Sequence, residues 1–125
     1  MKAIVATLAA IFISSSASAV SYTGNDLYLG LRDFKALTEP GGASKASTES
    51  AVRAFSAEGY LRGVIDSVGN EGYFCLPERW VMGQVIDVVH NYLKDNPRSR
   101  HDSAAIITGA VLSVTFPCKD SKLKK

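Results

Sequence analysis

Very few side chains in this sequence could act as nucleophiles, metal ligands or proton carriers near neutral pH. The 125 residues include two cysteines, Cys75 and Cys118, and two histidines, His90 and His101. Neither histidine has another histidine or cysteine within one or two helical turns, whereas a zinc site needs three or four ligands at suitable spacing. We therefore expect no metal site, and the sequence implies no cofactor.

Nothing in the sequence predicts catalysis. A cysteine nucleophile needs a free thiolate beside a base, and pairing of Cys75 with Cys118 would remove it. The sequence contains no G-x-S-x-G nucleophile elbow and no G-x-x-x-x-G-K-[ST] phosphate loop. A carboxylate pair for glycoside hydrolysis stays open, but no pair is singled out. We expect a binding protein and not an enzyme.

The first 19 residues have the pattern of a secretory signal peptide. Lys2 gives the positive start, an apolar run covers residues 3–13, and Ala17-Ser18-Ala19 forms an A-x-A cleavage site. The run is too short for a membrane-spanning helix, which needs about 20 apolar residues. A buried N-terminal helix is the alternative. Cleavage after Ala19 predicts a periplasmic protein with no membrane insertion, one domain over residues 20–118 and a basic tail over 119–125.

Net charge and cysteine content limit the classes of partner to expect and indicate the redox compartment. A formal net charge of +2 gives no electrostatic reason to expect nucleic acid. Exported proteins meet an oxidising environment, so Cys75 and Cys118 are expected to form a disulfide. The bridge would tie the start of one helix to the end of the next and make a stapled helical hairpin.

Four amphipathic segments with short connections predict an all-α fold, a small four-helix bundle stapled by one disulfide. The first helix is expected from near Asp26, capped by Thr23 or Asn25, to Pro40, and a flexible loop follows over residues 43–47. The other three are expected over residues 48–68, from Pro77 to the residue before Asn96, and from an N-cap at Asp102 to Pro117.

Residue spacing also predicts how these helices pack. Gly59 and Gly63 lie four apart on one face, so we expect another helix to approach closely there, with a kink near Gly59 as the alternative. The helix from Pro77 has an apolar arc wider than that of most surface helices, which predicts a central position, with His90 on its polar side. The last helix is expected to bury Ile107, Ala110, Val111 and Val114.

The loop from Asn96 to Asp102 is the most informative surface. It contains Pro97 for stiffness, two arginines that can form bidentate hydrogen bonds, and His101. A rigid loop loses little entropy on binding, and arginine is enriched at binding hot spots. The alternative is an ordinary solvated connection between helices.

Several motifs together resemble the Rap/Tai family of immunity proteins, which protect bacteria from type VI secretion amidase effectors. They are Gly59-Tyr60-Leu61-Arg62-Gly63-Val64-Ile65-Asp66, Phe74-Cys75-Leu76-Pro77 and Phe116-Pro117-Cys118, with Tyr22-Thr23-Gly24-Asn25-Asp26-Leu27 near the start. The resemblance covers nearly all of the chain after residue 20, and the two cysteine motifs with their spacing are its most specific part.

The resemblance implies a small helical periplasmic protein with a disulfide, often a homodimer. It implies a papain-like peptidoglycan amidase as partner, inhibited when a loop after the long helix enters the substrate groove of the enzyme. In this sequence that loop runs from Asn96 to Asp102. The predicted contact residues are Asn91, Lys94, Asp95, Pro97, Arg98, Ser99, Arg100 and His101.

Two other functions stay open. A periplasmic acid-stress chaperone would also be small, helical and disulfide-bonded, but it would bind many clients and only in acid. With two histidines, the chain has few groups that titrate between about pH 5 and 8. An unrecognised hydrolase would turn over peptidoglycan without any partner.

Overall fold

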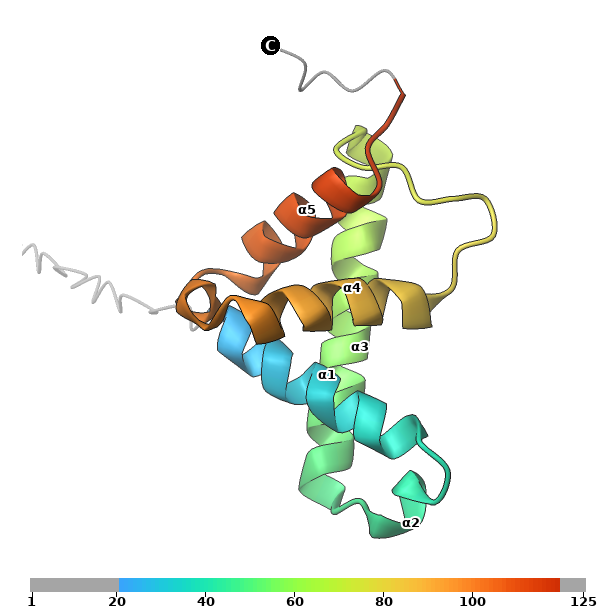
Figure 1. Cartoon of the computed structure of the whole chain (residues 1–125), viewed down its shortest axis with the longest axis vertical. Coiled ribbons are helices and arrows are strands. Elements are labelled where there is room, and N and C mark those ends of the chain that lie inside the picture. The colour runs from blue at the N-terminus through green and yellow to red at the C-terminus, as the bar shows by residue number, and fades with distance from the viewer. Residues whose placement is uncertain (1–20, 120–125) are drawn as a thin grey trace, which may run out of the picture.

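The computed structural model describes residues 21–119, and within them the fold is all-α, as predicted. The four main helices are α1 (Gly24–Thr38), α3 (Thr48–Val68), α4 (Met82–Asp95) and α5 (Ala104–Thr115) (Figure 1). Shorter elements are α2 (Gly42–Lys45), which overlaps the loop over residues 43–47 that was predicted to be flexible, and the 3-10 helices η1 (Gly69–Glu71) and η2 (Pro97–His101). The predicted signal peptide and most of the predicted tail lie outside the described residues.

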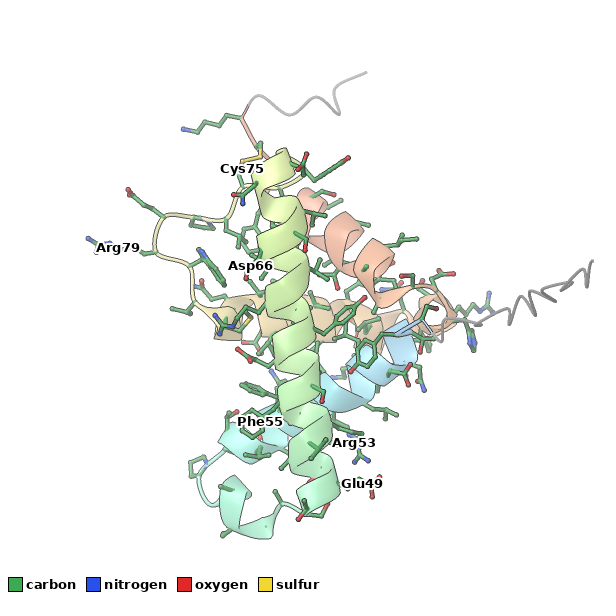
Figure 2. The ribbon with its side chains drawn as sticks, turned by 180° about the vertical axis from the view of Figure 1, so that it is seen from behind. Glu49, Arg53, Phe55, Asp66, Cys75 and Arg79 are labelled. Atoms are coloured by element: carbon green, nitrogen blue, oxygen red, sulfur yellow. A yellow bond between two sulfur atoms is a disulfide. The ribbon has the colours of Figure 1, made fainter. Side chains whose placement is uncertain are left out.

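Helix α3 forms one layer, and α1, α4 and α5 lie on one side of it (Figure 2). The core between the layers includes Leu27 and Leu31 of α1, Leu61 of α3, Val89 of α4 and Leu112 of α5, all fully buried. Helix α4 contacts α1, α3 and α5, which confirms its predicted central position. None of the helices within residues 21–119 is long and apolar enough to cross a membrane.

Local hydrogen bonds start the two long N-terminal helices where the sequence predicts. The Asp26 amide donates to Thr23 Oγ1 (3.2 Å) and the Thr23 amide donates back to the Asp26 carboxylate (3.0 Å), which is a capping box. The Ser50 amide donates to Ser47 Oγ (3.1 Å) at the start of α3. Helix α3 then continues unbroken through Gly59, so the predicted alternative of a kink does not occur.

An ion-pair network joins α1 to α3 at the surface. Arg53 Nε donates to Asp33 Oδ2 of α1 (2.8 Å), and Arg53 Nη1 donates to Glu49 Oε1 one turn earlier on α3 (2.7 Å; Figure 2). Burial alone would raise the pKa of Asp33, but the hydrogen bonds from Arg53 and Arg32 outweigh it and hold that pKa below its usual value.

The close helix approach occurs at a different glycine from the one predicted. A Cβ on Gly30 of α1 would lie 2.4 Å from Ala57 Cβ and 2.8 Å from the Arg53 carbonyl oxygen. Gly59 and Gly63 are exposed, with nothing within 4 Å of an added Cβ. The prediction of a helix packed against them is therefore wrong, because they lie on the outer face of α3.

Two helix starts also differ from prediction. Helix α4 begins at Met82 and not at Pro77, because residues 77–81 form a turn closed by the Trp80 amide on the Pro77 carbonyl (3.1 Å). Proline favours the first turn of a helix, but it favours β-turns equally. Helix α5 has Ser103 as N-cap in place of Asp102.

Helix α5 buries two of the four predicted residues, Ile107 and Val111, but its buried face is rotated away from the other two. Ala104, Thr108 and Leu112 are fully buried and Ile107 nearly so, whereas Val114 is 82% exposed. Ala110 is exposed as well. The helix contains no charged residue, so no polar stripe marks its outer face in the sequence.

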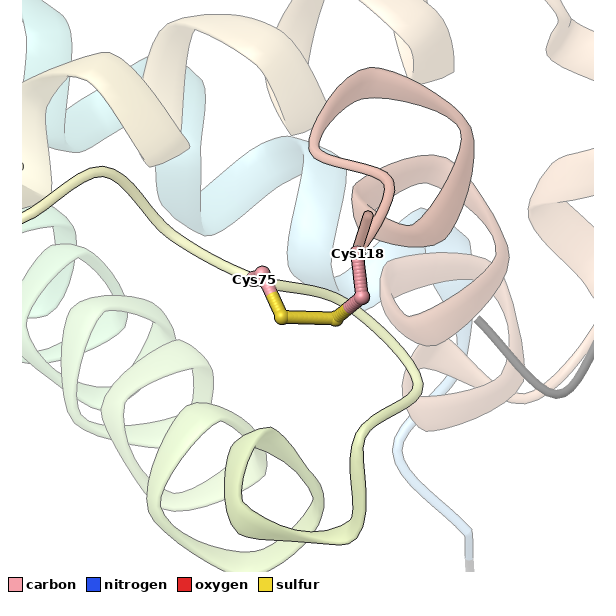
Figure 3. The surroundings of a disulfide bond; sticks show 2 residues. All are labelled: Cys75 and Cys118. Carbon is pink, nitrogen blue, oxygen red and sulfur yellow. A yellow bond between two sulfur atoms is a disulfide. The ribbon is translucent and has the colours of Figure 1, made fainter. Parts of the chain in front are cut away.

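Cys75 and Cys118 form the predicted disulfide, with their Cα atoms 4.9 Å apart. Cys75 lies on the connection after α3 and Cys118 follows α5 (Figure 3). The Cys75 amide also donates to the Phe116 carbonyl (2.8 Å). Because residues 76–81 separate Cys75 from α4, the bridge fastens the end of α5 beside the end of α3. It does not join the start of α4 to α5, as the stapled-hairpin prediction required.

Candidate partner-binding site

The predicted binding loop forms a corner between α4 and α5, beside the first turn of α1 (Figure 1). Residues 96–102 are termed the η2 corner. The Gly24 amide donates to the Asp102 carbonyl (2.9 Å), and the Ala104 amide donates to the Tyr22 carbonyl (3.0 Å). These bonds attach the corner to the chain that leads into α1.

The backbone of the η2 corner has its own series of hydrogen bonds. The Asn96 amide and the Asn96 side-chain nitrogen both donate to the Tyr92 carbonyl (2.9 Å each). The Ser99 amide donates to the Asn96 carbonyl (3.1 Å), and the Asp102 amide donates to the Ser99 carbonyl (3.1 Å). Together with the fixed φ of Pro97, these bonds define one backbone conformation for the corner.

Most of the predicted contact residues lie on the surface of this corner and of the adjoining turn of α4. The exposed ones are Asn91, Lys94, Asp95, Pro97, Arg98 and His101. Within residues 21–119, no hydrogen bond or ion pair engages the side chains of Arg98 and His101. The structure thus gathers these residues at one end of the molecule with their polar groups open to solvent.

Arg100 differs from its neighbours because its guanidinium points inward. Arg100 Nε donates to the Leu93 carbonyl (2.6 Å) and Nη2 donates to the Lys94 carbonyl (3.2 Å). The Arg100 Cζ atom lies 3.6 Å from the centre of the Tyr28 ring of α1. Arg100 and Ser99 are both half-buried, so these two predicted contact residues are the least accessible of the set.

His90 lies on the buried side of α4, contrary to the predicted polar position. It is 9% exposed, its Nδ1 is buried without a hydrogen-bond partner, and its ring stacks on Tyr28 with centroids 5.4 Å apart. Desolvation lowers the pKa of His90, and Lys35 and Lys94 lower it further. The burial of His90 could have been predicted from helical spacing, because His90 follows the core residue Ile86 by four positions.

An apolar groove between α3 and α5 is the surface that the sequence analysis did not predict. Its volume is about 450 Å³, and its lining residues are Val68, Tyr73, Ala105, Ile106, Gly109, Ala110 and Ser113. Ile106 is 71% exposed and Tyr73 is 53% exposed. This second, apolar surface could have been predicted from the sequence, because α5 contains no charged residue.

Residues 23–118 match the protein-family model described as Rap1a immunity proteins. The chain belongs to the Rap1a immunity protein family. The matched region contains all four main helices, both cysteines and the whole η2 corner. Membership confirms the family resemblance and implies that this Rap1a protein binds a cognate effector. No curated protein matches the chain.

Proposed function

We propose that this Rap1a protein is the periplasmic immunity partner of a type VI secretion peptidoglycan amidase. It inhibits the enzyme by binding, without catalysis of its own, and it inserts the η2 corner into the active-site groove. The observation that carries this proposal is the exposed group of Pro97, Arg98 and His101 on a backbone hydrogen-bonded to its neighbours on both sides. A corner ordered before binding loses little conformational entropy in the complex.

The corner also has suitable chemistry for a polar enzyme groove. Arg98 presents a guanidinium that can bind carbonyl or carboxylate oxygens with two parallel hydrogen bonds. Lys94 and Asp95 flank it at the end of α4 and are exposed. Charges of both signs at one tip favour a specific orientation in the groove and penalise mismatched partners.

The predicted signal peptide supports a periplasmic location, where peptidoglycan lies and where an incoming amidase would act. The disulfide supports the same location, because structural disulfides persist in oxidising compartments. Localisation is tested by fractionating cells and determining the N-terminal residue of the mature protein, which we expect to be Val20.

The first experiment measures peptidoglycan hydrolysis by the amidase encoded beside this gene, with and without the mature protein. We expect inhibition at a one-to-one ratio. Absence of inhibition, with no complex on a sizing column, would remove the amidase as partner.

Arg98→Ala tests the corner itself. Because the Arg98 side chain forms no hydrogen bond or ion pair with another residue of the range 21–119, we expect binding to weaken by more than about tenfold through loss of its contacts alone. Arg79→Ala is the matched control, since Arg79 is also exposed but lies on the connection before α4, away from the corner. Equal affinities for the two variants would place the binding site elsewhere.

We also propose that the protein forms a homodimer through the α3–α5 groove. Ile106 lines the groove and is 71% exposed, and Val114 of the same helix is 82% exposed. A hollow and a projection on one surface can pack against the same surface of a second copy related by a two-fold axis.

Light scattering tests the homodimer and should give a dimer for the wild type and for Val52→Glu on α3, and a monomer for Ile106→Glu. A monomeric wild type would contradict the proposal.

The exposed groove is also the observation that favours the chaperone alternative, because clients bind to apolar surface. The two functions differ in partner number and pH. An immunity protein binds one partner at neutral pH, whereas the chaperone would bind many unfolded proteins in acid. Turnover of peptidoglycan by the protein alone would instead indicate a hydrolase.

A further inference from the structure

The guanidinium of Arg100 closes the C-terminal end of α4. The last four carbonyls of a helix lack partners within the helix, and in α4 these belong to residues 92–95. Asn96 bonds the Tyr92 carbonyl, while Arg100 bonds the carbonyls of Leu93 and Lys94. A positive charge at this position also interacts favourably with the helix dipole.

The same side chain joins α4 and the η2 corner to α1. Its guanidinium stacks on Tyr28, and Tyr28 in turn stacks on His90 of α4. Stacking on an aromatic ring adds a cation–π attraction that is stronger where water is excluded. One residue therefore connects the corner to two helices by two kinds of contact.

The backbone at Arg100 is held as closely as its side chain. A Cβ on Gly24 would lie 3.0 Å from Arg100 Cα and 2.5 Å from Ile107 Cδ1, so the first turn of α1 packs directly on the corner. The hydrogen bond from the Gly24 amide to the Asp102 carbonyl lies beside this contact. Position 100 is thus the point at which the corner meets the body of the molecule.

We infer that Arg100 is a positioning residue for effector binding: it fixes the η2 corner in the conformation that exposes Pro97, Arg98 and His101, and it does not itself contact the effector. This inference rests on the proposed function of the corner. Arg98 and Arg100 then act differently, because loss of Arg98 removes contacts within the complex, while loss of Arg100 lowers the fraction of free protein that is ready to bind.

Lysine cannot replace Arg100 in this role. Its ammonium is a single point charge, whereas the guanidinium is a planar group that donates to two carbonyls and stacks on a ring. Phenylalanine can replace Tyr28, because the ring face carries the contact and no hydrogen bond from the Tyr28 hydroxyl is present within residues 21–119.

The test combines amide hydrogen exchange of the free protein with the kinetics of amidase binding. The disruptive variants are Arg100→Ala, Arg100→Lys and Tyr28→Leu; the matched controls are Arg98→Ala and Tyr28→Phe. In the disruptive variants we expect the Ser99 and Asp102 amides to exchange at least about tenfold faster than in the wild type, and no change in the controls. In the disruptive variants the association rate with the amidase should fall by a similar factor, while the dissociation rate should change by less than about threefold.

Unchanged exchange in Arg100→Ala would overturn the inference. So would faster dissociation at an unchanged association rate, because that result would make Arg100 a contact residue. Arg100→Lys keeps the charge and the aliphatic stem, so it decides the matter if the alanine variant does not fold. If the wild type binds no amidase, the proposed function fails, and the exchange data still decide whether Arg100 fixes the corner.

Discussion

His90 combines burial with a ring nitrogen that has no hydrogen-bond partner. Protonation would place a positive charge in this site, near the cations Lys35 and Lys94 and the anion Asp87, and against the Tyr28 ring. Desolvation and the two lysines outweigh the opposing effects of the Asn91 side chain and Asp87, so the pKa of His90 is lowered in the folded protein. The unfolded chain, in contrast, binds a proton there near pH 6.5.

This difference predicts that stability falls as the pH drops below about 6.5, because the unfolded state then binds more protons than the folded state. The loss continues until the pH passes below the folded pKa of His90, where it levels off. Urea unfolding between pH 7.5 and 5 measures it. We expect a weaker pH dependence in His90→Phe, which keeps a ring against Tyr28. Equal slopes in the wild type and this variant would contradict the assignment.

Arg98 and Arg100 show where sequence reasoning about the site reached its limit. Both are arginines in one short loop, so composition predicts the same role for each. Their different environments depend on the position of Tyr28, which is 72 positions before Arg100 in the chain and comes close only in the folded protein. The location of the corner could therefore be predicted from the sequence, but not the inward direction of one of its side chains.

At the scale of elements, local signals predicted the starts of α1 and α3, whereas the starts of α4 and α5 and the close approach of α1 and α3 were not predicted. The caps at Thr23 and Ser47 are short-range hydrogen bonds that the sequence shows directly. The close approach of α1 and α3 depends instead on Gly30 meeting Ala57, and a single glycine has no pattern that predicts it. The buried face of α5 was predicted only in part, with Ile107 and Val111 right and Ala110 and Val114 wrong, because every face of that helix is apolar or small.

The glycines of α1 and α3 give a matched stability test. Gly59→Ala and Gly63→Ala should each raise the free energy of unfolding by about 0.5–1 kcal/mol, because alanine favours the helix and the added methyl meets nothing within 4 Å. Gly30→Ala should lower it by about 1–3 kcal/mol, because neither Ala57 Cβ nor the Arg53 carbonyl can rotate away from the new methyl. Urea unfolding of the three variants measures the differences.

A stable Gly30→Ala protein would show that α1 and α3 can separate without loss. Destabilised Gly59→Ala or Gly63→Ala would show that the outer face of α3 is covered after all.

At the scale of the whole molecule, the disulfide and the η2 corner lie at different places. The bridge joins the connection after α3 to the segment after α5, while the corner lies where α4 meets α5 (Figure 1). The corner is held by contacts with α1 and α4 that do not involve either cysteine. The bridge therefore contributes to global stability more than to the shape of the corner.

Replacing both cysteines, as Cys75→Ser with Cys118→Ser, should lower the free energy of unfolding by up to about 4 kcal/mol, given a sequence separation of 43 residues. Where the variant is still folded, its affinity for the cognate effector, proposed above to be an amidase, should stay within about threefold of wild type, because distant sites contribute nearly independently. Thermal unfolding and binding measured on one preparation test both statements. A large loss of affinity in the folded variant would mean that the bridge shapes the corner.

The separation of roles within the η2 corner bears on how this protein can evolve. An immunity protein must follow changes in the toxin it neutralises, and each change at the interface risks damage to the fold. Here Arg98 and His101 face outward without internal hydrogen bonds to other described residues, while Arg100 holds the backbone. Selection can therefore change the outward positions to suit a new target without damage to the fold, so relatives with different targets can diverge at positions 98 and 101 and keep one architecture.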